Sequence, residues 1–121
     1  MRKPKSIISM QDIKNSRIRK GVRSIVERLE KYYKPEKIYL FGSAARSDFS
    51  EYSDIDLLVV KETNETSIQR MWEVYRILKG KSLPADIIVL TPSELTARIR
   101  SQDPFILEIV HHGINIYERV A

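Results

Sequence analysis

Three aspartates stand at the starts of two apolar segments. Asp54 and Asp56 open DIDLLVV (54–60), and Asp86 directly precedes IIVL (87–90). If residues 54–60 form a strand, side-chain alternation places Asp54 and Asp56 on one face, roughly 6–7 Å apart. If the two strands are neighbours, all three carboxylates lie at one end of the sheet. Like charges that close favour a bound cation, and carboxylate oxygens are ligands that Mg²⁺ prefers.

Such an acidic group suits phosphoryl or nucleotidyl transfer. Two Mg²⁺ ions about 3.5–4 Å apart can activate an attacking oxygen and stabilise the leaving oxygen. The alternative is structural, since acidic residues also serve as the polar ends of buried strands. That alternative would suffice for Asp86 alone or for an isolated Asp54-x-Asp56 motif.

The pair Gly42-Ser43 adds a second signal. It follows the apolar segment KIYLF (37–41) and precedes Ala44-Ala45-Arg46, a candidate helical turn. Glycine lets the backbone approach a phosphate closely, and N–H groups at a helix start bind anions. The Ser43 hydroxyl is a further donor, and Arg46 can pair with phosphate oxygens. An ordinary Gly-Ser turn is the alternative, but it does not account for the acidic residues a short loop away.

The elements that must position these residues follow from hydrophobic spacing and capping signals. Helices are predicted over 11–33, ending before Pro35, and over 68–78, ending at Gly80. Thr91-Pro92-Ser93-Glu94 is a capping box that starts another helix. The remaining elements are a helix from Asp103-Pro104 to Gly113 and strands at 37–41, 54–60, 84–90 and 114–117.

This order predicts an α/β (α+β) fold with a mixed β-sheet of about four strands and helices packed mainly on one face. Only the connection 61–83 is clearly long enough for a parallel crossover, and the loop 42–53 suits antiparallel or mixed pairing. The segment 54–60 reads as a strand buried on both faces. We expect a single domain over residues 1–121, with residues 1–10 a flexible basic arm.

Composition narrows the classes of protein. The 121 residues include no Cys and no apolar run long enough to span a membrane, so a cytoplasmic protein is expected. The net charge of +5 is uneven, because residues 1–37 hold twelve Lys/Arg against four Asp/Glu. This basic N-terminal third could bind nucleic acid, but it lacks the interleaved aromatic residues of a stacking surface. A solvated helix face is therefore favoured.

The spacing of these motifs resembles a known family. Gly42-Ser43, ten residues and then Asp54-x-Asp56 match the G-S-x10-D-x-D pattern of minimal nucleotidyltransferases, a branch of the DNA polymerase beta-like superfamily. The whole segment GSAARSDFSEYSDIDLLVV (42–60) is similar to that family, and Asp86 fits its third acid. The closing segment IVHHGINIYE (109–118) also resembles the usual end of the family.

The resemblance implies the polymerase beta-like nucleotidyltransferase fold, ATP as donor and two Mg²⁺ ions as cofactor. It implies that Asp54 and Asp56 hold the metals and that Asp86 completes the site as ligand or base. Gly42 and Ser43 would bind the nucleotide phosphates with support from Arg46. Small members of this kind are commonly antitoxins that bind HEPN-type RNase toxins and adenylylate a toxin tyrosine. The implied acceptor is therefore a partner protein, because the chain has no room for a separate acceptor-binding domain.

Two other functions stay open. A catalytically idle relative would neutralise its partner by binding alone, although the intact set of three acids argues against it. Transfer to a small molecule or an RNA end is the other alternative.

Two further groups of residues attract a functional interpretation. His111-His112 suggests a metal site, but adjacent side chains on a helix point in different directions, so surface or helix-end residues are favoured. Trp72, with Met71 and Tyr75, is interpreted as core or partner contact rather than as a base-stacking platform.

Overall fold

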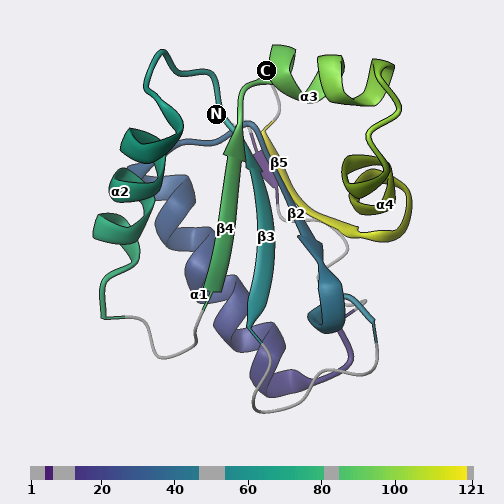
Figure 1. Ribbon diagram of the computed structural model, residues 1–121. Helices are drawn as coiled ribbons and strands as arrows, with labels where there is room; N and C mark the ends of the chain where they lie inside the picture. Colours follow the sequence, from purple (N-terminus) through teal and green to yellow (C-terminus); the bar gives the residue numbers. More distant parts are fainter. Residues whose placement is uncertain (1–4, 7–12, 47–53, 81–84, 120–121) are drawn as a thin grey trace.

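The computed structural model describes residues 5–6, 13–46, 54–80 and 85–119. Over these ranges, the chain forms strands and helices that succeed one another, with α3 followed directly by α4 (Figure 1). The elements are β1 (Lys5–Ser6), α1 (Ser16–Tyr32), β2 (Lys37–Phe41), the 3₁₀ turn η2 (Gly42–Ala44), β3 (Ile55–Val60), α2 (Ser67–Leu78), β4 (Ala85–Leu90), α3 (Pro92–Arg100), α4 (Pro104–His112) and β5 (Ile114–Arg119).

The strands form one mixed sheet in the order β1-β5-β2-β3-β4. Strands β3 and β4 are parallel and are joined by the crossover through α2, whereas the other pairs are antiparallel. The long connection 61–83 thus joins a parallel pair of strands, and the short loop 42–53 joins the antiparallel pair β2 and β3, as their lengths predicted. The α+β class with a mixed sheet is confirmed.

Helix ends follow local capping. Helix α1 starts at Ser16, five residues after the predicted start, because the Asn15 side chain accepts hydrogen bonds from the N–H groups of Arg17 and Ile18. The predicted capping box at α3 is present, with Thr91 and Glu94 bonded reciprocally. A second capping box at the start of α2, formed by Thr66 and Gln69, was not predicted.

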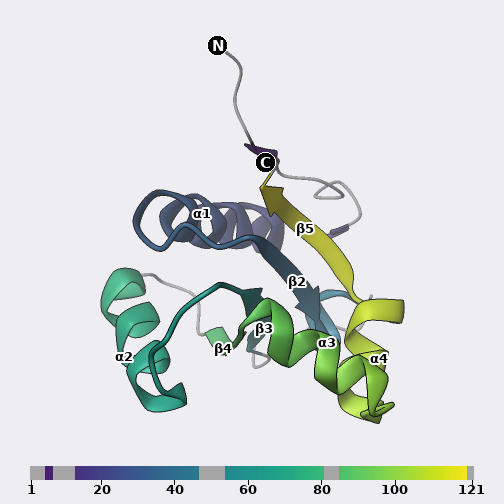
Figure 2. The ribbon, with the colours of Figure 1, turned by 90° about the horizontal axis from the view of Figure 1, so that it is seen from above.

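The helices lie on both faces of the sheet, which corrects the prediction that they pack mainly on one. Figure 2 shows α1 and α2 on one side and α3 and α4 on the other. One core cluster joins α1 and α2 to side chains such as Leu57 and Val59 of β3. A second cluster joins α3 and α4 to Leu58 and Val60 of the same strand. A strand that is apolar at successive positions must be covered on both sides, so its burial requires two helical layers.

The N-terminal segment 1–10, expected to be a flexible arm, contributes a short strand. Lys5 and Ser6 pair antiparallel with Arg119 and Glu118 of β5, whereas residues 1–4 and 7–10 lie outside the described part of the chain.

One ion pair links the two helical layers at the far end of β4. The guanidinium of Arg70 in α2 donates to both carboxylate oxygens of Glu94 in α3, at 2.7 and 3.1 Å. Arg70 also donates to the carbonyls of Glu65 and Val89. These bonds compensate the burial of the Arg70 side chain, which is only 7% exposed. The ion pair and the hydrogen bond from Thr91 lower the pKa of Glu94 to about 2.

Within the described residues, no helix is both long enough and apolar enough to cross a membrane.

Candidate active site

The three aspartates lie at one end of the sheet. Asp54 is the residue immediately before β3, while Asp56 and Asp86 are the second residues of β3 and β4. Because these strands are parallel neighbours, Asp56 and Asp86 face each other in register. Adjacent strands are about 4.8 Å apart, so the two carboxylates leave the sheet side by side. The condition that the sequence left open, that the two acidic strands are neighbours, is met.

The charges of the three aspartates act on one another. The pKa of Asp56 is raised above its usual value, first by partial burial and then by the charges of Asp86 and Asp54. Arg46 opposes this rise with its positive charge. Four of the predicted site residues therefore share one local electrostatic field, which favours binding of a cation.

The carboxylates do not form a preassembled metal cage. Among the residues described, no three His, Cys, Asp or Glu side chains lie close enough together to hold a metal ion. The oxygen donors match the preference of Mg²⁺, and the mutual repulsion at Asp56 is what a cation would relieve. The residues thus fit a divalent metal in chemistry, and binding would have to draw them closer together.

Gly42 carries the closest packing of the site. Its φ of +72° lies in the left-handed region, which side chains with a Cβ rarely adopt. A Cβ at this position would overlap Oδ2 of Asp56 and lie 3.2 Å from its Cγ. Glycine is required here for two reasons, since the backbone turns sharply and the Asp56 carboxylate occupies the place of a side chain.

The turn that follows begins earlier than expected. The turn predicted at Ala44-Ala45-Arg46 overlaps η2, which starts at Gly42 and ends at Ala44. The N–H groups of Ala45 and Arg46 donate to the Gly42 carbonyl, at 3.1 and 3.2 Å. The positive φ of Gly42 lets the chain leave β2 and turn without an intervening loop. Ser43 lies half-buried in the turn and Arg46 lies exposed just after it.

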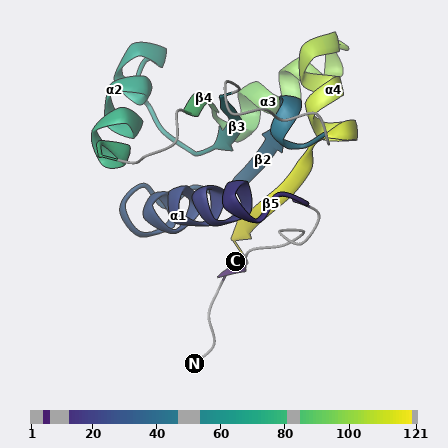
Figure 3. The same ribbon diagram turned by 90° about the horizontal axis from the view of Figure 1, so that it is seen from below.

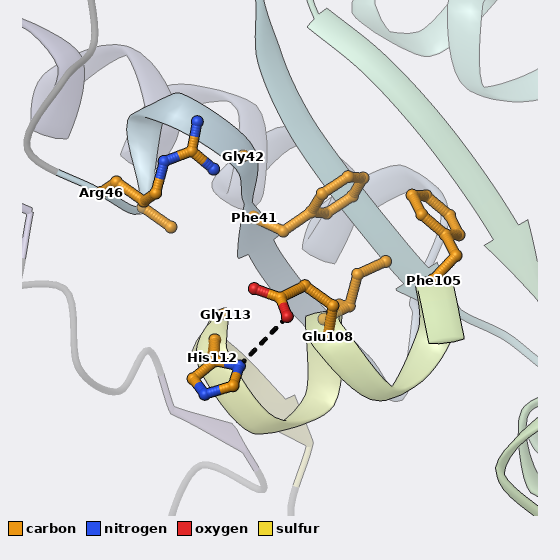
Figure 4. A pocket seen from close by; sticks show the side chains of 9 residues that line it. Phe41, Gly42, Arg46, Phe105, Glu108, His112 and Gly113 are labelled. Atoms are coloured by element: carbon orange, nitrogen blue, oxygen red, sulfur yellow. Dashed lines mark ion pairs between the residues drawn. The ribbon is translucent and has the colours of Figure 1, made fainter. Parts of the chain in front are cut away.

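A pocket of about 560 Å³ opens beside this turn, between the end of β2 and helix α4. In Figure 3 the turn after β2 lies next to α4, and Figure 4 shows the side chains around the pocket. One wall is formed by Phe41, Gly42, Ala45 and Arg46, and the other by Phe105, Glu108, Ile109, His112 and Gly113.

The residues of the α4 wall were not predicted as site residues from the sequence. Phe105, Glu108, Ile109 and His112 are spaced by three and four residues, which places them on one helix face. That spacing was readable, but nothing in the sequence placed α4 beside Gly42. His112 lies at the helix end, as expected, with Nδ1 3.3 Å from Oε1 of Glu108, and its side chain is 72% exposed.

Comparisons with known proteins agree with this geometry. The family model of the nucleotidyltransferase domain matches residues 22–110. A Methanocaldococcus jannaschii protein named "putative protein adenylyltransferase" is 29% identical over 83 residues, which cover 69% of this chain and 80% of the relative. A second protein of that organism with the same description is 43% identical over 47 residues, 37% of this chain and 47% of the relative.

A solved structure also has this fold. The crystal structure of a "putative nucleotidyltransferase" from Sulfolobus solfataricus superposes with a TM-score of 0.55 at 29% identity, covering 86% of this chain and 85% of that one. The family model spans well over half of the chain and includes Gly42, Ser43, Asp54, Asp56 and Asp86. The chain therefore belongs to the nucleotidyltransferase family, as its motif spacing predicted.

Proposed function

We propose that this protein transfers AMP from Mg²⁺-bound ATP to a hydroxyl group of a partner protein. The observation that carries the proposal is the pairing of Asp56 with Asp86 in register, directly beside the turn at Gly42. Acids that could hold a metal and a backbone that could receive phosphates thus meet at one point.

In this reaction the acceptor oxygen forms a bond to the α-phosphorus of ATP. The bond from that phosphorus to the bridging oxygen breaks, pyrophosphate leaves, and the hydroxyl proton passes to a carboxylate or to water. Bound Mg²⁺ would supply charge stabilisation for the phosphates and the attacking oxygen. Asp54 and Asp56 would hold the metal ions, with Asp86 as third ligand or as general base.

The phosphates would lie against the turn. Gly42 presents backbone without a side chain there, and Ser43 contributes a hydroxyl donor. The positive charge of Arg46 already acts on Asp56, so its guanidinium lies close enough to the acidic site to pair with phosphate oxygens bound there.

The exposed face of α2 supports a protein as acceptor. Trp72 is 70% exposed, and Ile68, Met71 and Tyr75 beside it are 61%, 44% and 43% exposed. These residues follow the spacing i, i+3, i+4 and i+7, so they form one apolar stripe, while Val74 and Leu78 face the core. The stripe is exposed rather than part of the core, and this exposure supports partner contact. Contiguous exposed apolar surface of this kind is typical of protein interaction sites.

We propose a HEPN-type RNase toxin as the partner, which this protein would neutralise as an antitoxin in the cytoplasm. The two archaeal relatives are named as protein adenylyltransferases, and these names support a protein acceptor. The family resemblance of the motif suggests the toxin class.

The test is intact-mass analysis of the candidate toxin after incubation with this protein, ATP and Mg²⁺. We expect a gain of one or more AMP units, which Asp56→Asn abolishes. Glu27→Gln is the matched control, because Glu27 is an exposed carboxylate on α1, on the opposite side of the sheet. Unmodified toxin with the wild-type protein, or full modification by Asp56→Asn, would refute the proposal.

Binding alone is the second candidate function, and the α2 stripe favours it as much as it favours catalysis. It predicts that Asp56→Asn still neutralises the toxin, whereas Trp72→Ser does not.

Transfer to an RNA end is a third candidate function, for which the basic N-terminal third would provide the surface. Strong RNA binding that weakens steeply with salt would support that alternative.

A further inference from the structure

The pocket between η2 and α4 is joined to the acidic site. Phe41 in its wall pairs in register with Asp56 on the antiparallel strand β3. Directly opposed residues on antiparallel strands point to the same face, with their Cβ atoms about 4.5–5.5 Å apart. Gly42, which packs against the Asp56 carboxylate, also lines the pocket. A molecule in the pocket would therefore extend directly to the proposed phosphate and metal positions.

The walls suit a flat, partly apolar ligand. The rings of Phe41 and Phe105 meet edge to face, with centroids 5.7 Å apart and an interplanar angle of 87° (Figure 4). Phe105 is nonetheless 48% exposed, so part of this large apolar side chain is still uncovered. A volume of about 560 Å³ lies in the range of small-molecule sites, which are mostly apolar with a few polar groups.

The polar groups lie around this apolar part. Glu108 and His112 stand one helical turn apart on the α4 wall, and Arg46 lies on the wall next to Gly42 (Figure 4). An ionised carboxylate only accepts hydrogen bonds. With the purine held in one orientation against Phe105, Glu108 can therefore accept a hydrogen bond from the 6-amino group of adenine, at the position where guanine carries its O6 acceptor.

We propose that this pocket holds the nucleoside of the donor nucleotide, with the base against Phe105 and its amino group bonded to Glu108. This inference rests on the proposed function and assigns the residues that choose the base. The position of the pocket favours the nucleoside over an acceptor side chain, because the ligand must continue into the phosphate site at Gly42.

The test compares the binding of three ligands to the full chain by calorimetry in the presence of Mg²⁺: ATP, GTP and inorganic tripolyphosphate. Phe105→Ala should weaken ATP binding about tenfold, since base stacking on an aromatic side chain is lost. It should leave tripolyphosphate binding unchanged. Glu108→Gln should reduce the preference for ATP over GTP about tenfold, because a neutral amide can donate to O6 of guanine.

Ile99→Ala is the control, because Ile99 is an exposed apolar residue on α3 and does not line the pocket. Thermal unfolding of each variant shows that it is folded. Wild-type ATP affinity in both pocket variants would overturn the proposal while leaving the proposed function intact. Unchanged ATP binding with a raised KM for the partner protein would instead place the acceptor in the pocket. If the wild-type protein transfers no AMP and binds neither ATP nor tripolyphosphate, the proposed function itself is wrong.

Discussion

The two faces of the sheet are built differently. Under α1 and α2, the core cluster includes fully buried side chains from both ends of α1, such as Ile18 and Leu29, and from three strands. Under α3 and α4 the cluster is smaller, with Leu58 and Ile106 fully buried but Leu95 still 9% exposed. The acidic residues and the pocket lie on this second side, where the apolar packing stops short of the starts of β3 and β4.

The closed face under α1 and α2 therefore supplies most of the packing that stabilises the fold, whereas the open face carries the residues proposed to do the chemistry. The strands alternate between faces, so Leu57 and Val59 contribute to the closed core while Asp56 and Leu58 point to the open side. Asp56 can be held near Asp86 and Asp54, at a cost in charge repulsion, because the opposite face of the same strand is firmly packed. Four variants test the separation, in order of decreasing expected effect.

The largest effect is expected for Asp56→Asn. The proposed AMP transfer should fall by roughly 10³-fold or more, since the proposed role of Asp56 as a metal ligand is worth several kcal/mol. The unfolding temperature should rise slightly, because partial burial and the neighbouring acids disfavour the charged carboxylate. Rate assays and thermal unfolding measure the two effects. A loss of stability together with activity would show that Asp56 is a structural residue.

Leu29→Ala should do the reverse of Asp56→Asn: it should lower stability and leave activity unchanged. Leu29 is fully buried in the closed core, so its truncation should cost about 2–5 kcal/mol of unfolding free energy. AMP transfer per folded molecule should not change. Leu95→Ala on the open side is the matched variant and should cost less, because water can reach its position at the edge. Urea unfolding measures both costs, and equal losses would contradict the difference between the faces.

Gly42→Ala should moderately reduce both the stability of the fold and the rate of AMP transfer. A left-handed backbone costs an alanine about 1–2 kcal/mol, and the added methyl group would displace the Asp56 carboxylate. Gly80→Ala is a close control, since Gly80 also has a positive φ of +92° but no atom within 4 Å of an added Cβ. Both variants should lose stability in urea unfolding, whereas only Gly42→Ala should lose transfer. Equal transfer activity of the two variants would show that Gly42 does not contribute to the site.

The smallest effect is expected for Glu94→Gln, which weakens the link between the two helical layers. Because its pKa is lowered to about 2, the Glu94 carboxylate stabilises the fold above about pH 4.5 and loses this effect as the pH falls toward 2. The variant should be about 1 kcal/mol less stable at neutral pH, a modest value because the side chain is 43% exposed. Its stability should also vary less between pH 4.5 and 2. Urea unfolding across this range measures both, and identical pH profiles would contradict the assignment.

Much of the fold was readable from local patterns. The β2 and β3 segments, the capping box at Thr91 and the helix that begins at Pro104 are set by side-chain periodicity and by bonds between close neighbours in sequence. The helix distribution was predicted wrongly, although the continuous apolar run of β3 already required cover on both faces. The start of α1 was placed too early because hydrophobic spacing does not reveal the Asn15 cap.

The sequence by itself marked the proposed donor half of the site. Gly42, Ser43, Asp54 and Asp56 lie within one short segment, so their spacing marks the motif before any fold is known. Only the tertiary structure decided that Asp86 stands beside Asp56, that the Asp56 carboxylate fills the space above Gly42, and that Phe105 and Glu108 of α4 face the turn. These contacts join residues that are distant along the chain, and they depend on strand order and helix packing, which local patterns do not encode.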